Sequence, residues 1–229
     1  MSDIRNFATQ KHDFYRIMRK ILLCLFSLLL MIPAIAQQSQ ETKRINRAVI
    51  YPEFRHAKIL QTFGRYVMGD VNIYVKDASL LFIDKDKTVR RAANKNIIGV
   101  QFDDTTKYMR VDDTAMGLVL AESKSNALLC VTVLDEEKHK TETISFADID
   151  LGTTNVLVEL NTDNEGRLGV PLKDTFYFSI KGRIVQANET NLKKEIRPEM
   201  KKEFRELMED RWWSWKDPKN LKDILRFLP

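Results

Sequence analysis

A chain of 229 residues with 44% hydrophobic and 30% charged residues has the composition of a folded protein, which excludes a collagen-like or largely disordered chain. Its 37 basic and 32 acidic residues give a formal net charge of +5 at pH 7. Five of the basic and two of the acidic residues precede Gln37, so the chain from there onward has a net charge of only +2. This small surplus argues against nucleic acid as a partner.

An apolar run near the start predicts an export signal. The run Ile21 to Ile32 follows Arg19 and Lys20 and is followed by Ala34-Ile35-Ala36. Twelve helical residues span about 18 Å, which is too short to cross a hydrocarbon core of about 30 Å. A basic flank, a short apolar core and an Ala-x-Ala end are typical of a secretory signal peptide. We expect cleavage between Ala36 and Gln37, which leaves a periplasmic or extracellular chain without a stable membrane span.

The segment before this run is longer than the usual start of a signal peptide. Met18-Arg19-Lys20 fits such a start closely, so translation begins either at Met1 or at Met18. We therefore expect residues 1–36 to be an N-terminal extension and cleavable signal peptide. Residues 37–229 are then a single exported α+β domain, β-rich over about 45–187 and helical over about 190–229.

The segment Ala127 to Leu134 is the clearest strand in the sequence. Seven of its eight residues are apolar, which predicts a strand covered on both faces. Short apolar or alternating segments precede it, and turn residues rich in Asp, Asn, Lys and Ser separate them, which favours an antiparallel meander. The expected strands are 57–61, 71–75, 80–83, 88–92, 98–102, 108–111, 114–121, 127–134 and 155–160.

A hairpin and two helices complete the predicted fold. Residues 175–180 and 183–187 flank Lys181-Gly182, and a two-residue loop would pair Ile180 with Arg183, whereas a bulged three-residue loop is the alternative. The apolar period then changes to 3.6, after Pro198 and again after Pro218. The predicted fold class is α+β: an antiparallel, strongly curled β-meander sheet followed by two C-terminal amphipathic helices packed on it.

Three tryptophans, Trp212, Trp213 and Trp215, form the most conspicuous aromatic cluster. In an exported protein, exposed tryptophans can stack on sugar rings or anchor a protein partner. The alternative is that they fill the junction between the two helices and the sheet. They are the candidate ligand-binding or partner-binding residues.

Two short motifs resemble the acceptors of bacterial periplasmic O-glycosylation. They are Asp104-Thr105-Thr106 and Asp113-Thr114-Ala115, with Thr105 and Thr114 as the candidate acceptors. The neighbouring acidic pairs could also form a calcium site, but Asp is common in turns, where its side chain hydrogen-bonds the backbone, which explains these pairs without a metal.

Catalytic groupings are missing from the sequence. Cys130 lies mid-strand between apolar residues, which favours a packed thiol over a nucleophile. His56 and His139 have no close metal-ligating partner in the sequence, so we expect no metal and no cofactor.

The leader and the overall layout resemble the small exported proteins of unknown function of Gram-negative bacteria. That resemblance implies no site residues. The sequence favours a non-enzymatic periplasmic or cell-surface interaction module that uses loop ends, a sheet edge or the tryptophan region to hold an envelope protein or a glycan. The alternative is a cell-envelope glycan-acting enzyme that draws on the acidic turns, for which two carboxyl groups about 5 to 10 Å apart in a groove would be needed.

Overall fold

A computed structural model describes residues 42–146 and 169–229. The signal peptide, the alternative start at Met18 and the expected strand 155–160 lie outside the described residues. The chain divides into two units, Met1–Thr42 and Lys43–Pro229, and the fold below is that of the second unit. No described helix is long and apolar enough to cross a membrane.

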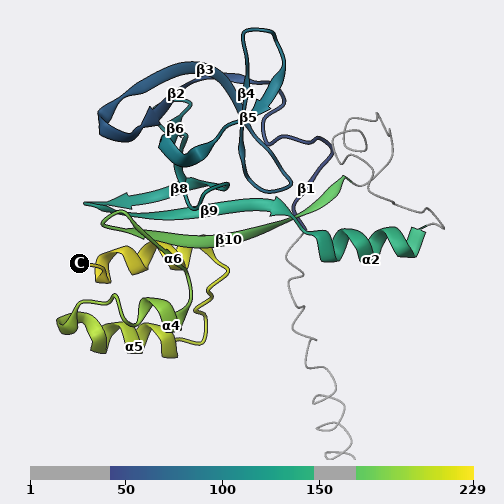
Figure 1. Cartoon of the computed structure of the whole chain (residues 1–229). Helices are drawn as coiled ribbons and strands as arrows, with labels where there is room; N and C mark the ends of the chain where they lie inside the picture. The colour runs from purple at the N-terminus through teal and green to yellow at the C-terminus, as the bar shows by residue number, and fades with distance from the viewer. Residues whose placement is uncertain (1–41, 147–168) are drawn as a thin grey trace, which may run out of the picture. The chain divides into compact units, whose positions relative to one another are not determined.

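The second unit begins with a long series of strands and ends with short helices (Figure 1). The strands are β1 (Arg44–Ile45), β2 (Arg55–Gln61), β3 (Tyr66–Ile73), β4 (Leu80–Ile83), β5 (Val89–Arg91), β6 (Ile97–Gln101), β7 (Lys107–Arg110), β8 (Met116–Ser123), β9 (Asn126–Leu134), β10 (Val170–Ile180) and β11 (Arg183–Gln186). The α-helices are α2 (Glu136–Phe146), α4 (Glu189–Leu192), α5 (Lys201–Glu209) and α6 (Pro218–Ile224), with 3-10 turns at Thr62–Gly64, Asn94–Asn96, Pro198–Met200 and Leu225–Phe227.

The described strands form one antiparallel sheet of eleven strands, which confirms the predicted meander. The order is β1-β10-β9-β8-β7-β6-β2-β3-β4-β5, and β11 pairs with β10. The expected strong curl is wrong, because the sheet is not strongly curled. Strong curvature needs repeated bulges or glycine kinks, whereas the pairing register of the described strands shifts only between Leu60 and Gln61 and between Val119 and Ala121.

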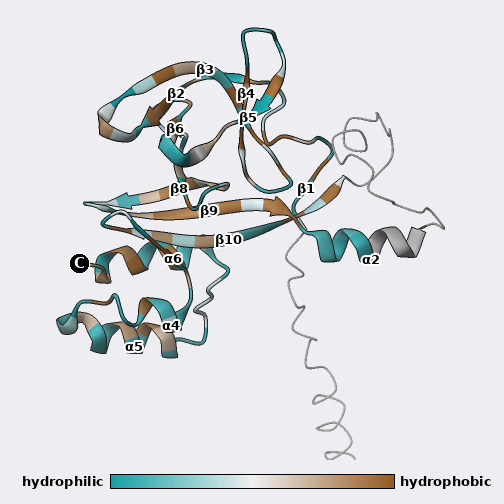
Figure 2. Ribbon diagram, viewed as in Figure 1, coloured by the Kyte–Doolittle hydropathy of each residue, from teal (hydrophilic) through white to brown (hydrophobic). Residues whose placement is uncertain are grey.

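Strand β9 lies at the centre of the packing, as its sequence predicts. Its residues Ala127 to Val131 are buried, and Figure 2 shows apolar residues along most of its length. In Figure 1 the strands β2, β3 and β6 lie above β8, β9 and β10, while α4, α5 and α6 lie below them. Val131 belongs to the core on the first side, which includes Ile59 and Val71, and Leu128 belongs to the core on the helical side.

The C-terminal helices cover one face of β9 and β10, as predicted. Phe204 of α5 and Leu221 of α6 share a buried cluster with Phe178 of β10. Asp217 caps α6 by accepting a hydrogen bond from the Lys219 backbone N–H at 2.8 Å. Helix α2 follows β9 and runs from Glu136 to Phe146, and Oδ1 of Asp135 accepts a hydrogen bond from the Lys138 backbone N–H at 3.1 Å.

The β10–β11 hairpin has the predicted two-residue loop. Ile180 pairs with Arg183, and Phe178 pairs with Val185. Lys181 and Gly182 both have positive φ, 49° and 86°, which matches the twist of the flanking strands.

A buried amide joins the start of the domain to β3. Asn72 is fully buried, and its Nδ2 donates to the backbone carbonyls of Tyr51 and Glu53 at 2.9 and 3.0 Å. Its Oδ1 accepts from the backbone N–H groups of Tyr51 and Ile73 at 3.1 and 2.8 Å. The three bonds to Tyr51 and Glu53 fix the segment before β2 against β3.

Candidate partner-binding surface

Strand β3 is paired along most of its length on one side and only at its end on the other. Strand β2 pairs with β3 from Leu60–Tyr66 to Arg55–Val71. On its other side β3 pairs with β4 only over residues 71–73. The register of that pairing sets Ile83 opposite Asp70. Among the strands that the structure describes, none pairs with that side of Tyr66–Gly69, which we call the β3 edge.

Apolar side chains are unusually exposed along this hairpin. Tyr66, Val67 and Met68 are 55, 45 and 53% exposed, so consecutive side chains on both faces of β3 meet solvent. Phe63, in the loop before β3, is 93% exposed. Soluble proteins rarely leave a hydrophobic strand edge exposed and unpaired, because such an edge pairs readily with another chain.

The backbone of the β3 edge has a regular hydrogen-bonding pattern. The Gln61 N–H donates to the Arg65 carbonyl at 2.8 Å, which makes this a hydrogen-bonded pair. Hydrogen-bonded and non-hydrogen-bonded pairs alternate along an antiparallel ladder. It follows from the β2–β3 register that the N–H and C=O groups of Tyr66, Met68 and Asp70 point away from β2.

Basic groups accompany the apolar residues of the hairpin. The Lys58 ammonium lies 4.2 Å from the centroid of the Tyr66 ring, which is a cation–π contact. Arg65 is exposed in the loop. Asp70 is the one acidic residue of residues 55–70, and its Oδ1 lies 3.0 Å from Nδ1 of His56. The β3 edge therefore has a basic end at the loop and an acidic residue at the other end.

The loop holds Phe63 in an unfavourable backbone conformation. Phe63 has φ 60° and ψ 31°, in the left-handed region that bulky residues rarely adopt. This conformation costs about 1 to 2 kcal/mol for a residue with a Cβ. A side chain that is both strained and exposed contributes nothing to the core, so it points to a role in binding.

The three candidate tryptophans do not form one surface. Trp212 is 82% exposed, and its backbone is held by Asp210 and Asn220. Trp213 and Trp215 instead pack edge to face, with ring centroids 5.6 Å apart, against the helical core. Two of the three tryptophans thus pack at the junction between the helices and the sheet, as the alternative prediction expected.

The two candidate glycosylation residues lie on exposed loops. Thr105 lies between β6 and β7, and Thr114 lies between β7 and β8. The Thr105 hydroxyl donates to Oδ1 of Asp103 at 2.8 Å. Nothing in the structure tests their modification, which stays a prediction.

The acidic turns use their carboxylates to hold their own loops. Hydrogen bonds from Thr105 keep the pKa of the Asp103 carboxyl well below its usual range, and those from Thr88 lower the pKa of Asp86. Asp112 accepts the backbone N–H groups of Thr114 and Ala115, both at 2.7 Å. A general acid needs a raised pKa, so the carboxyl groups of Asp103 and Asp86 do not suit that role. No group of three metal-ligating side chains occurs among the described residues.

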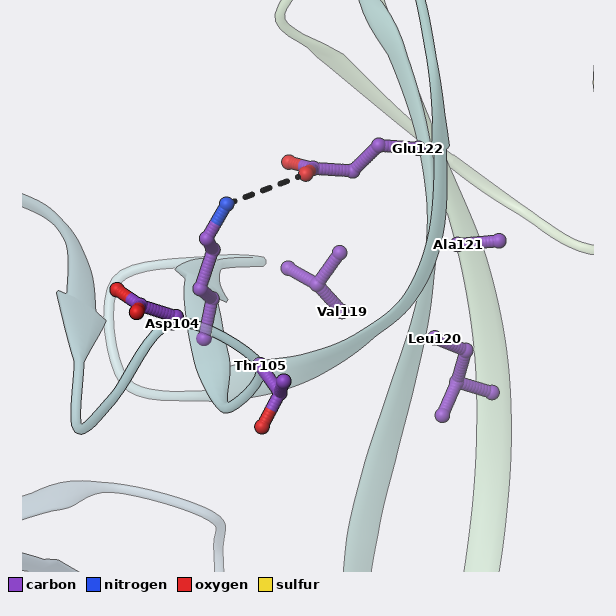
Figure 3. A pocket seen from close by; sticks show the side chains of 7 residues that line it. Asp104, Thr105, Val119, Leu120, Ala121 and Glu122 are labelled. Atoms are coloured by element: carbon purple, nitrogen blue, oxygen red, sulfur yellow. Dashed lines mark hydrogen bonds and ion pairs between the residues drawn. The ribbon is translucent and has the colours of Figure 1, made fainter.

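The depression beside Thr105 is too small for a substrate. It measures about 170 Å³, below the range of about 300 to 1,000 Å³ that ligand pockets occupy. The Lys107 ammonium lies 3.4 Å from the Glu122 carboxylate, and a dashed line marks this ion pair at Glu122 in Figure 3. Its lining residues are Asp104, Thr105, Lys107, Val119, Leu120, Ala121 and Glu122.

Cys130 is a buried thiol, as its sequence context predicts. Burial raises its pKa to about 11, which disfavours the thiolate that a nucleophile needs. Tyr108 lies nearby, 3.2 Å from the Tyr51 hydroxyl, and burial raises its pKa as well. These groups belong to the packing of the sheet.

Sequence reasoning named a sheet edge as a possible binding surface but did not identify this one. Residues 66–70 lie outside the predicted strands, which end at Gln61 and resume at Val71, because Phe63-Gly64 is typical of a bend. The signal that was available is the run Tyr-Val-Met after the loop, three consecutive apolar residues that no alternating pattern buries.

Comparison with known proteins adds no relative: no family model, no curated protein and no solved structure matches the chain.

Proposed function

We propose that this chain is a non-enzymatic interaction module that binds an extended segment of a partner protein by adding it as a strand to the β3 edge. The observation that carries the proposal is the unpaired row of backbone groups at Tyr66–Gly69 beside exposed apolar side chains. An added strand would satisfy those groups and bury side chains on both faces. Because the leader predicts export, the partner is an envelope or cell-surface protein.

A protein fits this surface better than a lipid or a glycan does. Lipid tails offer no hydrogen-bonding groups, so insertion of the hairpin into a bilayer would leave the outward N–H and C=O groups of Tyr66 and Met68 unpaired. A glycan site would use several aromatic faces around a groove, whereas Trp213 and Trp215 pack into the helical core. The backbone of a partner strand supplies the N–H and C=O groups with which the unpaired groups of this edge can form hydrogen bonds.

Phe63 is the anchor of the proposed surface. Its ring is exposed beside the edge, and the left-handed backbone of the loop holds it there. Aromatic anchors that enter a partner's pocket dominate many interfaces and cost about 2 kcal/mol or more when removed. Phe63→Ser should therefore weaken binding while leaving the fold intact.

A photo-crosslinking experiment in the native cells tests the proposal. A photoreactive phenylalanine analogue replaces Tyr66 in one strain and Thr190, an exposed residue of α4, in a control strain. Met68→Pro is the matched edge-blocking change, because the Met68 N–H points away from β2 and its loss spares the hairpin. We expect a discrete protein adduct at position 66 that Met68→Pro abolishes and that position 190 does not give.

The proposal requires that formation of the adduct depend on the β3 edge. A missing adduct, or one that persists in Met68→Pro, would refute strand addition. Circular dichroism of Met68→Pro must show an unchanged β-sheet signal. If it does not, Tyr66→Pro, which also removes only an outward N–H, repeats the test with the photoreactive residue moved to position 63, where the native Phe63 is 93% exposed.

A further inference from the structure

We propose that the β3 edge binds an extended, acidic segment of its partner, antiparallel to β3, in which two apolar residues are followed by two acidic ones. This inference rests on the proposed function, because it names the chemistry of the strand that adds to the same surface. The open length of the edge sets the size of the segment. The loop ends at Arg65, and Asp70 already lies opposite Ile83 of β4. Only Tyr66–Gly69 can therefore take a new strand.

The direction of the added strand follows from the sheet. Every pair of strands in the described part of the chain is antiparallel, and antiparallel pairing is slightly more stable per residue than parallel pairing. An antiparallel segment runs in the same direction as β4, which approaches the open edge at Ile83. The segment therefore enters beside the end of β4 and leaves at the loop. Its first residue lies opposite Gly69 and its fifth opposite Arg65.

The backbone of the edge selects an extended segment. The N–H and C=O groups of Tyr66 and Met68 point away from β2 and toward the added strand. The residues opposite them form hydrogen-bonded pairs, each of which exchanges two bonds. The fourth and second residues of the segment thus make backbone hydrogen bonds that do not depend on their side chains. The exposed side chains of the edge therefore decide which sequence binds.

Exposed apolar side chains determine the second and third positions of the segment. Met68 and Val67 are neighbours in β3, so their half-exposed side chains project from opposite faces of the strand. Val67 pairs with Ile59, a residue of the core, and so lies on the core face of the hairpin. Opposed residues of an antiparallel pair have Cβ atoms about 4.5 to 5.5 Å apart. Apolar residues at the second and third positions therefore cover Met68 on one face and Val67 on the other.

Basic side chains determine the fourth and fifth positions. The fourth residue lies opposite Tyr66, and the Lys58 ammonium lies over the ring of that tyrosine, 4.2 Å from its centroid. The fifth residue lies opposite Arg65, which is exposed. Residues 55–69 contain no Asp or Glu, so the hairpin presents positive charge at its loop end. Asp70, beyond the other end of the open edge, would repel an acidic residue at the first position. The charges therefore favour acidic residues at the loop end of the segment.

Two peptides of equal composition test the sequence and its direction. The fluorescein-labelled peptide Thr-Val-Val-Glu-Glu-Thr has the proposed order, and Thr-Glu-Glu-Val-Val-Thr has the reverse order. The reversed peptide keeps the side-chain contacts only if it pairs parallel, and it keeps antiparallel pairing only if its acidic residues face Met68 and Val67. Fluorescence anisotropy with the purified protein, at concentrations up to about 1 mM, measures both affinities. We expect the first peptide to bind about fivefold or more tightly than the second, and Met68→Pro to abolish its binding.

A charge exchange tests the acidic positions. Lys58→Glu places a carboxylate beside the fourth residue and should weaken binding of the first peptide about tenfold. The peptide Thr-Val-Val-Lys-Glu-Thr should instead bind Lys58→Glu more tightly than it binds the parent protein. Lys194→Glu, a charge change at an exposed residue after α4, is the matched control and should leave both affinities unchanged. Affinities that do not respond to the exchange at Lys58 would overturn the acidic assignment.

The outcomes separate this inference from the proposed function. Absence of binding by the first peptide, equal binding of the two orders, or binding that persists in Met68→Pro would overturn the inference. An edge-dependent adduct at position 66 in cells would then leave the proposed function standing with a segment of different sequence. Mass spectrometry of that adduct gives an independent check, because the crosslinked stretch should contain two apolar residues followed by two acidic ones. Loss of both the peptide binding and the adduct would refute the two together.

Discussion

Replacing Phe63 with glycine should stabilise the folded chain. The left-handed conformation of Phe63 costs about 1 to 2 kcal/mol, and glycine adopts the same conformation without that cost. Glycine gives back about 0.5 to 1 kcal/mol through the larger entropy of the unfolded chain. Because Phe63 is 93% exposed, almost no burial is lost. The net gain in the free energy of unfolding is therefore about 0.5 to 1 kcal/mol.

Urea unfolding of the purified protein, followed by circular dichroism, measures this gain. For a chain of this size about 1 kcal/mol corresponds to a shift of about 2 to 4 °C in Tm. Two protein concentrations tenfold apart separate the intrinsic stability from any contribution of association.

Gly64 provides the matched control in the same loop. It has φ 70° and open space around its Cα, so Gly64→Ala introduces strain without a clash and should destabilise the fold by about 1 kcal/mol. A Phe63→Gly variant that is less stable than the parent would refute the strain argument. Phe63→Gly should also weaken partner binding. Higher stability together with weaker binding would show that the native Phe63 lowers stability in favour of function.

Three further predictions concern the interior. Asn72→Ala leaves several buried backbone groups without their partner and should cost about 2 to 4 kcal/mol in urea unfolding, whereas an unchanged midpoint would contradict the four-bond assignment. Because the folded pKa of Cys130 is raised to about 11, its thiol should resist alkylation at pH 8 until the protein is unfolded. Its contribution to stability is fully present below the unfolded pKa of about 8.5 and is lost as pH rises toward 11. Trp213→Ala should cost about 2 to 3 kcal/mol, because Trp213 packs against the helical core, and Trp212→Ala should change stability by less than about 0.5 kcal/mol. Equal effects of the two tryptophan changes would contradict the packing described for them.

Much of the fold was predictable because local patterns and tertiary packing agree. The apolar segment 127–134 is buried on both faces, and the Lys181-Gly182 loop has the predicted pairing of Ile180 with Arg183. Asp217 and Pro218 mark the start of α6 in the sequence as in the structure. In each case a few neighbouring residues contain the physical cause.

The curvature of the sheet was not predictable in the same way. It depends on where bulges interrupt the register, and the shifts at Leu60 and Val119 have no residue signature that distinguishes them from their neighbours. The candidate surface depends on the strand pairing, because residues 66–69 are an edge only where β4 does not accompany β3.

The sequence by itself determined the class of fold, most strand and helix positions, the inert setting of Cys130 and the turn roles of the acidic residues, since each follows from composition, period or caps within a short stretch. Only the tertiary structure decided which strand edge lacks a partner, which tryptophans pack against the helical core, and that Phe63 is held outward. Those properties arise from contacts between segments far apart in the chain, where no local pattern records which side of a strand its neighbour will occupy.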